Sequence, residues 1–152
     1  MIFSKTWKYA VRALIYLAEH PEEGPILSST IAKKEKIPEP FLVKILGTLA
    51  SAGLVNSIRG RNGGFQIEIA PGNITLMDIA KLFDFFQDKG KCLLGYGFCE
   101  DDRACPVHHF WAEPESHIKS FLNNTTIKDL CGAITKDQNQ KELLETKEIS
   151  AQ

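Results

Sequence analysis

Apolar residues near the start of the chain recur at the spacing of an α-helix. Between residues 6 and 20 they fall three or four positions apart, while lysine, arginine and glutamate mark the other side. This pattern predicts an amphipathic helix with one buried face. A Pro-Glu-Glu-Gly-Pro stretch at 21–25 predicts its end, because proline and glycine interrupt helices.

Two further helices with a tight turn between them are predicted next. The first covers residues 30–35, and Ser28 and Ser29 precede it as candidate N-caps. Pro38 then forces a turn, because the residue before a proline is disfavoured in the helical conformation. The second helix covers 39–52 and has one apolar side, and Gly53 is placed to close its C-terminus.

Alternating apolar and polar residues then indicate a β-hairpin. Residues 54–58 and 65–69 alternate with a period of two, and a glycine- and arginine-rich stretch at 59–64 lies between them. Alternation around a glycine-rich turn is typical of two antiparallel strands. Two helices and a hairpin in this order predict a winged helix-turn-helix.

The second half of the chain alternates between helical and irregular stretches. Thr75 is placed to cap a helix that reaches about residue 85. Residues 87–106 lack any periodicity, and an irregular stretch of about twenty residues in a compact domain is usually functional. Helical spacing returns over 107–123, where Pro114 predicts a kink or a restart, and a short helix is expected from Thr126.

These elements predict a mainly α fold with a small β-hairpin, in which a winged helix-turn-helix precedes a long C-terminal helix. The expected domains are a DNA-binding winged helix-turn-helix at 1–85, a cysteine-containing loop at 86–106, a long and a short helix at 107–135, and a flexible polar tail at 136–152.

Composition and charge fit a globular protein with two unlike parts. Hydrophobic residues make up 43% and charged residues 24% of the chain. Neither a signal peptide nor a membrane span is recognised, so a cytoplasmic location with reduced thiols is expected. Residues 1–70 carry nine Lys/Arg and six Asp/Glu, and residues 71–152 carry nine and thirteen. The basic excess in the first part favours contact with nucleic acid there.

The predicted helix-turn-helix and hairpin provide candidate DNA contacts. In such folds the second helix enters the major groove and presents its N-terminal residues to base edges. Arginines on a glycine-rich hairpin tip can reach phosphates or the minor groove. Taken one at a time, these features have a simpler explanation: the lysines could form an ordinary solvated face, and the hairpin could have no role in binding. The candidate DNA-binding residues are Lys5, Lys33, Lys34, Glu39, Pro40, Phe41, Lys44, Arg59, Arg61, Asn62 and Gly63.

Three of the four cysteines are clustered ahead of a histidine. Gaps of six, five and two residues separate, in order, Cys92, Cys99, Cys105 and His108. Iron–sulfur clusters take thiolates from irregular backbone, and histidine can replace cysteine at an iron. Zinc also accepts three cysteines and a histidine, but its structural sites usually have shorter gaps. The charged residues between the second and third cysteines disfavour a core role, whereas Cys131 is expected to be a buried structural thiol.

Two adjacent histidines compete for the fourth ligand position. On a helix that starts near residue 106, His108 and His109 point about 100° apart, so only one should face the cysteines. The short distance in sequence to Cys105 favours His108.

Taken together, these patterns resemble the IscR/NsrR family of iron–sulfur-dependent winged-helix transcription regulators, and the IscR-like members in particular. The resemblance extends from Ser-Lys at 4–5 to about residue 130. It includes Arg-Gly-x-x-Gly-Gly-Phe at 59–65, Cys-x-x-His-x-x-Trp at 105–111 and Phe-Leu-Asn-Asn at 121–124. The last two motifs are specific, because generic winged-helix proteins do not combine them with three clustered cysteines.

The resemblance implies a homodimer joined through the helix at 107–123, with two recognition helices that read a palindromic operator in double-stranded DNA. It also implies an iron–sulfur cluster, most simply 2Fe–2S with 4Fe–4S as the alternative, held by the three clustered cysteines and His108. Nitric-oxide sensors of the family use an acidic residue of the partner's first helix instead. The matching positions here are Lys8 and Arg12, which cannot serve as ligands.

The expected function is a DNA-binding transcription regulator, not an enzyme, whose operator binding is controlled by an iron–sulfur cluster. Its signal would be iron–sulfur status, oxidant or nitric oxide, and the cluster assembly machinery is an expected further partner. The alternatives are a zinc site or a direct thiol redox switch at the same cysteines, and a winged helix that binds protein. Catalysis is disfavoured because no base is recognisably paired with a cysteine nucleophile.

Overall fold

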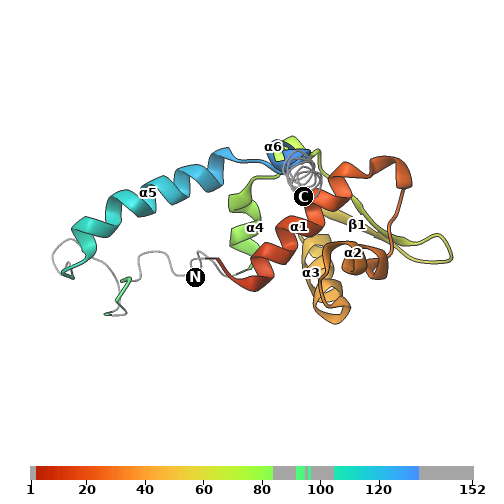
Figure 1. Ribbon diagram of the computed structural model, residues 1–152, viewed down its shortest axis with the longest axis horizontal. Helices are drawn as coiled ribbons and strands as arrows, with labels where there is room; N and C mark the ends of the chain where they lie inside the picture. The colour runs from red at the N-terminus through yellow and green to blue at the C-terminus, as the bar shows by residue number, and fades with distance from the viewer. Residues whose placement is uncertain (1–2, 84–91, 95, 97–104, 134–152) are drawn as a thin grey trace, which may run out of the picture.

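The computed structural model describes residues 3–83, 92–94, 96 and 105–133. This part of the chain is mainly helical with one antiparallel hairpin, as predicted (Figure 1). The elements are, in order, α1 (Lys5–Glu19), η1 (Pro21–Glu23), α2 (Ser28–Glu35), α3 (Glu39–Ser51), β1 (Val55–Ile58), β2 (Gly64–Ile67), η2 (Pro71–Asn73), α4 (Leu76–Leu82), α5 (His108–Asn124) and α6 (Ile127–Leu130).

Helix α1 lies at the centre of the hydrophobic core. It begins at Lys5, one residue before the predicted start, where the hydroxyl of Ser4 accepts a hydrogen bond from the backbone N–H of Trp7 at 3.1 Å and caps the helix. Helices α2, α3, α4 and α6 all contact α1. The largest fully buried side chains are Leu14, Ile31, Leu42, Leu46, Leu49, Ile74, Leu76, Ile79, Leu122 and Ile127.

The turn between α2 and α3 is tight, as the proline predicted. Lys36 adopts a left-handed conformation with φ 52°, and the N–H of Ile37 donates to the carbonyl of Ala32 at 2.9 Å. The predicted cap of α2 is wrong by one residue. The helix begins at Ser28 itself, and the N-cap position is Leu27, which offers no side-chain acceptor.

The hairpin is joined to the rest of the molecule by a third backbone segment. Strands β1 and β2 pair in an antiparallel register that sets Val55 opposite Ile67. Ile26, which precedes α2, exchanges two backbone hydrogen bonds of 2.8 Å with Phe65. This bridge fixes the hairpin beside the helix-turn-helix, and the sequence pattern alone did not indicate it.

The C-terminal helices are anchored to the start of α4. Thr75 and Thr126 form an isolated antiparallel bridge, and each also heads a capping box at the start of its own helix. Helix α5 is continuous through Pro114, so the predicted restart does not occur. The side chains around this proline are exposed, and water can therefore satisfy the carbonyl that loses its helical partner.

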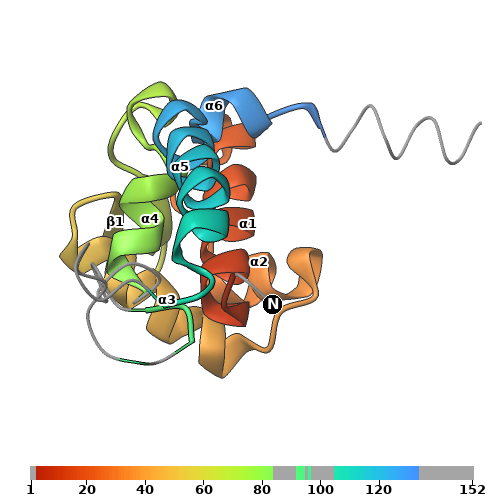
Figure 2. The same ribbon diagram turned by 90° about the vertical axis from the view of Figure 1, so that its left-hand side faces the viewer.

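Helix α5 extends away from the other helices. Figure 1 shows its N-terminal end far from the hairpin, and Figure 2, turned by 90°, shows it beside α4, with which it makes its contacts. Among the described side chains of α5, Leu122 is the buried one. No helix in the described ranges is long and apolar enough to cross a membrane.

Candidate nucleic-acid interface and cysteine segment

The helix-turn-helix is held to α1 by an ion pair at the end of α2. The guanidinium of Arg12 lies 3.1 Å from the carboxylate of Glu35 and also donates to the backbone carbonyl of that residue. The same guanidinium lies over the ring of Tyr9, 5.9 Å from its centroid. The side chains of the pair are only partly exposed, at 39% and 22%. These contacts fix the end of α2, and therefore the turn that leads into α3.

Helix α3 has one buried face and one exposed face. Its buried residues are Leu42, Ile45, Leu46 and Leu49. On the exposed side, Phe41 is 63% and Val43 45% accessible. At its N-terminus, the hydroxyl of Ser28 donates to the carboxylate of Glu39 at 3.2 Å and links α3 to the start of α2.

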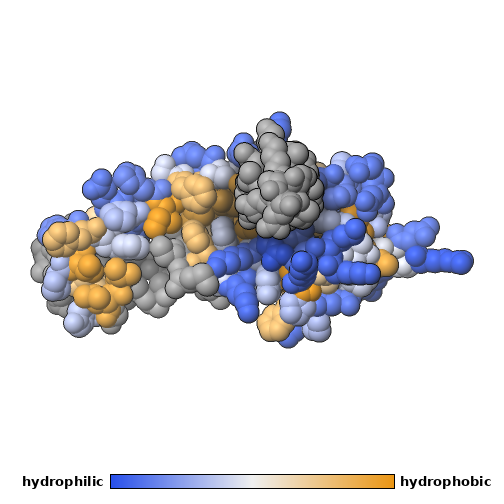
Figure 3. Space-filling view, in the orientation of Figure 1, coloured by the Kyte–Doolittle hydropathy of each residue, from blue (hydrophilic) through white to orange (hydrophobic). Residues whose placement is uncertain are grey.

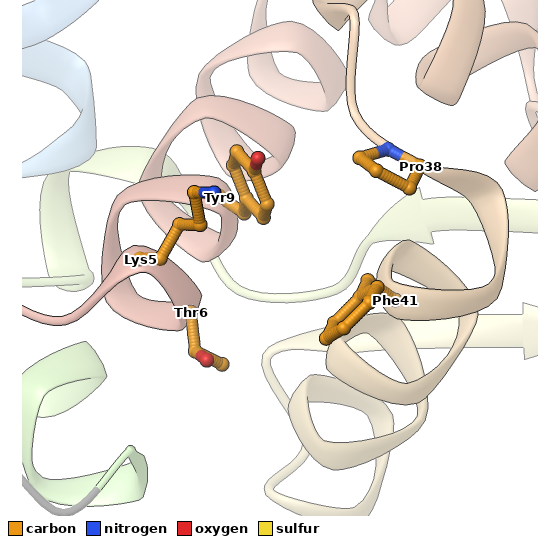
Figure 4. Close-up of a pocket in the computed structure, with 5 residues that line it drawn as sticks. All are labelled: Lys5, Thr6, Tyr9, Pro38 and Phe41. Carbon is orange, nitrogen blue, oxygen red and sulfur yellow. The ribbon is translucent and has the colours of Figure 1, made fainter.

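A small pocket of about 100 Å³ lies between the N-terminal ends of α1 and α3. Figure 4 shows Lys5, Thr6 and Tyr9 approaching it from α1, opposite Pro38 and Phe41. The fold therefore brings the predicted contact Lys5 next to the predicted recognition helix. The sequence did not indicate that Thr6 and Tyr9 also line this pocket, although Tyr9 is one helical turn from Lys5.

The hairpin tip presents the predicted polar residues to solvent. Arg59, Arg61 and Asn62 are all exposed. Gly63 is buried, and its N–H donates to the carbonyl of Gly60 at 3.0 Å. A side chain at Gly63 would collide with the backbone carbonyl that ends β1. The geometry therefore gives Gly63 a role in shaping the tip.

A second basic surface lies on α2. An open hollow of about 590 Å³ is lined by Ser29, Thr30, Lys33 and Lys34. Phosphate oxygens accept hydrogen bonds from hydroxyls, from ammonium groups and from the backbone N–H groups at the N-terminal end of a helix. Sequence reasoning named the two lysines and missed the hydroxyls, which precede them by one helical turn. Figure 3 shows mainly hydrophilic side chains over the half of the molecule that carries α2 and the hairpin.

Ten of the eleven predicted DNA-contact residues are exposed, and Gly63 is the buried one. They come from α1, α2, α3 and the hairpin tip. Apart from Glu39, the charged members of the set are basic, so they can meet a polyanion together. This part of the molecule is therefore suited to a long, negatively charged ligand.

Two of the three clustered cysteines lie in the described part of the chain. Cys92 and Cys105 are both 8% exposed, and neither belongs to the main hydrophobic cluster. Cys99 lies outside the described residues. Within those residues, no three histidine, cysteine or acidic side chains are close enough together to hold a metal ion. The thiols and His108 nevertheless provide the soft sulfur and nitrogen donors that iron accepts.

The start of α5 ties the candidate histidine to the third cysteine. The backbone N–H of His108 donates to the carbonyl of Cys105 at 2.9 Å. The His108 side chain is half-buried and that of His109 is exposed, with their rings edge to face and centroids 5.5 Å apart. The two histidines thus differ in exposure, and which of them faces the cysteines stays a prediction.

The fourth cysteine occupies a different environment. Cys131 packs against the main core, and its thiol donates to the carbonyl of Ile127 at 3.2 Å. Partial burial, followed by the charge of Glu19, raises the pKa of Cys131 above its usual value. A protonated, hydrogen-bonded thiol fits the predicted structural role, although its side chain is half-buried rather than fully buried.

Comparison with known proteins identifies the family. Residues 3–133 match the profile of the Rrf2 family, described as an iron-dependent transcriptional regulator. The chain belongs to the Rrf2 family. An HTH-type transcriptional regulator of Aquifex aeolicus is 43% identical over 132 residues, which cover 86% of this chain and 91% of the relative. IscR of Vibrio campbellii is 30% identical over 142 residues, which cover 93% and 82%.

Solved structures of Rrf2 regulators share the fold. CymR of B. subtilis, described as the global cysteine regulator, matches with a TM-score of 0.72 and 27% identity over 86% of this chain and 96% of that one. IscR of T. potens matches with a TM-score of 0.64 and 28% identity over 84% of each chain. The resemblance expected from the sequence is confirmed. This Rrf2 protein is a transcriptional regulator with a DNA-binding winged helix.

Proposed function

We propose that this Rrf2 protein is a homodimer whose affinity for a palindromic operator is controlled by an iron–sulfur cluster. Its ligands would be Cys92, Cys99, Cys105 and His108. The observation that carries the proposal is the burial of Cys92 and Cys105 apart from the main hydrophobic core. Thiols shielded from water but not packed in the core suit a cluster better than an ordinary structural role.

The donor set is consistent with this cofactor. Three cysteines and one histidine can satisfy a 2Fe–2S cluster, and the family profile is that of iron-dependent regulators. When bound, the cluster would supply a group that oxidant, nitric oxide or iron shortage can alter or remove. The protein's part is to hold the Cys105 and His108 side chains together, which the hydrogen bond between their backbones supports.

A series of contacts between helices leads from Cys105 and His108 to the helix-turn-helix formed by α2 and α3. Helix α5 begins at His108, and its other end is held where the N–H of Leu76 donates to the carbonyl of Thr125 at 2.9 Å. Helix α4 in turn contacts α1, on which α3 packs. A shift at the start of α5 could therefore reach the helix-turn-helix. A coupling free energy of about 1–3 kcal/mol would change operator affinity about 5- to 150-fold.

On the DNA side, α3 would enter the major groove and the hairpin tip would follow the phosphate backbone. The exposed face of α3, the arginines Arg59 and Arg61, and the hollow beside Lys33 and Lys34 support this arrangement. It is the docking mode of winged helix-turn-helix proteins in general.

Assay of the metal content tests the cluster. The protein should be purified without oxygen, and its absorption and EPR spectra recorded together with iron and acid-labile sulfide. We expect a coloured protein with sulfide near iron, and loss of most of both in Cys92→Ala, Cys99→Ala and Cys105→Ala. Cys131→Ala is the matched control and should retain both, because this thiol lies in the hydrophobic part of the molecule.

Normal iron content in Cys99→Ala would contradict the ligand assignment. Colourless protein that contains zinc, or that takes up no metal on reconstitution, would replace the cluster by a zinc site or a thiol switch. Neither result would affect the assignment of the winged helix to DNA binding.

A further inference from the structure

The face of α3 that points away from the core carries few side chains that can donate a hydrogen bond to a ligand. Residues at helical spacing form this face, and all of them are exposed: Pro40, Val43, Lys44, Gly47 and Ser51. The branched side chain of Val43 is 45% accessible. No residue on this face is arginine, asparagine or glutamine, the side chains that most often read base edges by hydrogen bonding.

The hydroxyls of Thr48, beside this face, and of Ser51, on it, are turned back onto their own helix. Thr48 donates to the carbonyl of Lys44 at 3.1 Å, and Ser51 donates to that of Gly47 at 3.0 Å. The carboxylate of Glu39 accepts the hydroxyl of Ser28. Lys44 is therefore the one residue of α3 with a charged donor to offer to a base.

Within the described part of the chain, nothing requires a glycine at position 47. It is the ninth residue of a thirteen-residue helix, where glycine lowers helix propensity. A side-chain carbon built at Gly47 meets no atom of the other described residues within 4 Å. A glycine that the protein itself does not need is useful where another molecule must approach the helix backbone closely.

We propose that α3 recognises its operator largely through thymine methyl groups, with Val43 packed against a methyl and Gly47 letting the DNA approach the helix. This inference rests on the proposed entry of α3 into the major groove. Thymine is the base that presents an apolar group there, and the other bases offer hydrogen-bonding groups that valine would leave unpaired. The exposed basic residues Lys33 and Lys34 on α2 and Arg59 on the hairpin favour DNA over an apolar protein partner.

Replacing thymine by deoxyuridine tests the proposal, because it removes only the methyl group. An operator is first selected from a random duplex pool with the full-length protein, purified without oxygen. Each thymine of that operator is then replaced in turn. We expect the affinity to fall about fourfold at the contacted position, as for loss of one buried methyl group.

The protein variants assign the effect to the proposed residue. Val43→Ala should bind the thymine operator more weakly and show no further decrease in affinity when deoxyuridine is introduced. Arg59→Ala is the matched control, since it weakens binding from the hairpin tip and should keep the full sensitivity to deoxyuridine. The proposal is overturned if no thymine is sensitive, or if Val43→Ala remains as sensitive as the natural protein.

Gly47→Ala tests the close approach separately. The operator affinity should fall about tenfold or more, while the midpoint of thermal unfolding stays the same or rises. Unchanged affinity would contradict the role of Gly47. A selection that enriches no sequence would instead contradict the proposed function, so the two failures are distinguishable.

Discussion

Gly64 shows how a single backbone position determines where the hairpin lies. Its φ of 145° is a conformation that residues with a side chain rarely adopt, and a side-chain carbon there would lie 2.5 Å from the backbone of Ile26. Ile26 and Phe65 exchange their hydrogen bonds next to this position. The glycine therefore permits the contact that holds the hairpin against the helix-turn-helix.

Substitution of this glycine should destabilise the fold. We expect Gly64→Ala to lower the free energy of unfolding by about 1–3 kcal/mol, because of the backbone strain and the collision with Ile26. Gly47→Ala is the matched control and should raise it by about 0.5–1 kcal/mol, since alanine is the better helix former and meets open space. Urea unfolding measures both, and a loss of stability in both variants would contradict the distinction between the two glycines.

At the scale of elements, the exposed hairpin tip and the short helix α6 each depend on a few side chains. The tip carries Arg59 and Arg61 on a turn closed by the hydrogen bond from Gly63 to Gly60. Helix α6 begins with a capping box, in which the Thr126 hydroxyl donates to the Asp129 carboxylate at 2.6 Å. Each element can be tested without disturbing the core.

Removal of a tip arginine should weaken DNA binding in a salt-dependent way. For Arg59→Ala and Arg61→Ala we expect the slope of log affinity against log salt to become less negative by about 0.9 for each phosphate that the variant no longer neutralises. Lys119→Ala removes the same charge from α5, where Lys119 pairs with Glu115, and serves as the control. Unchanged affinity and slope in both arginine variants would show that the tip does not touch phosphate.

The capping box of α6 should make stability depend on pH. Hydrogen bonds from the Thr126 hydroxyl and backbone lower the pKa of Asp129 below its ordinary 3.8. Its ionised form therefore stabilises the fold above pH 3.8, and this contribution is lost as the pH falls through the lower, folded-state pKa.

Thr126→Ala should accordingly be less stable than the natural protein at neutral pH, and the difference should narrow in acid. Urea unfolding at several pH values gives this comparison, with Asp129→Asn as a control that lacks the titrating group. A difference that is constant with pH would contradict the electrostatic part of the explanation.

At the scale of the whole molecule, the described part of the chain leaves a large apolar surface on and near α5. Figure 3 shows hydrophobic residues gathered over the end of this helix. Phe110 is 79% and Phe121 50% exposed, and Leu93, Leu94 and Tyr96 are exposed as well. Exposed apolar surfaces of this kind are typical of interaction sites, and in the proposed homodimer a second copy of the chain would cover this one symmetrically.

Weakening this surface should separate the proposed dimer. We expect Phe110→Ser to raise the dimer dissociation constant at least about tenfold, because each copy would lose an aromatic side chain that the proposed dimer buries. Sedimentation analysis measures the change. Phe41→Ser on α3, which removes an equally apolar exposed side chain, should leave the dimer intact. A natural protein that is monomeric at all accessible concentrations would contradict the dimer itself.

The sequence by itself determined the order and type of the elements. Helical periodicity, alternation and the Pro and Gly interruptions act over a few residues, so α1, α3 and the hairpin lie close to their predicted positions. The caps at Thr75 and Thr126 were predicted correctly for the same reason. The family resemblance also rested on local motifs. The ligand roles of Cys92, Cys99, Cys105 and His108 all stay predictions, and Cys99 lies outside the described residues.

Only the tertiary structure decided how these elements meet. The bridges of Ile26 with Phe65 and of Thr75 with Thr126 join segments far apart in sequence, and local patterns contain no information about such partners. Likewise, the exposure of Val43 and the open space at Gly47 depend on which side of α3 packs against α1. Packing assigns one face of a helix to the core and thereby leaves the other face for a ligand.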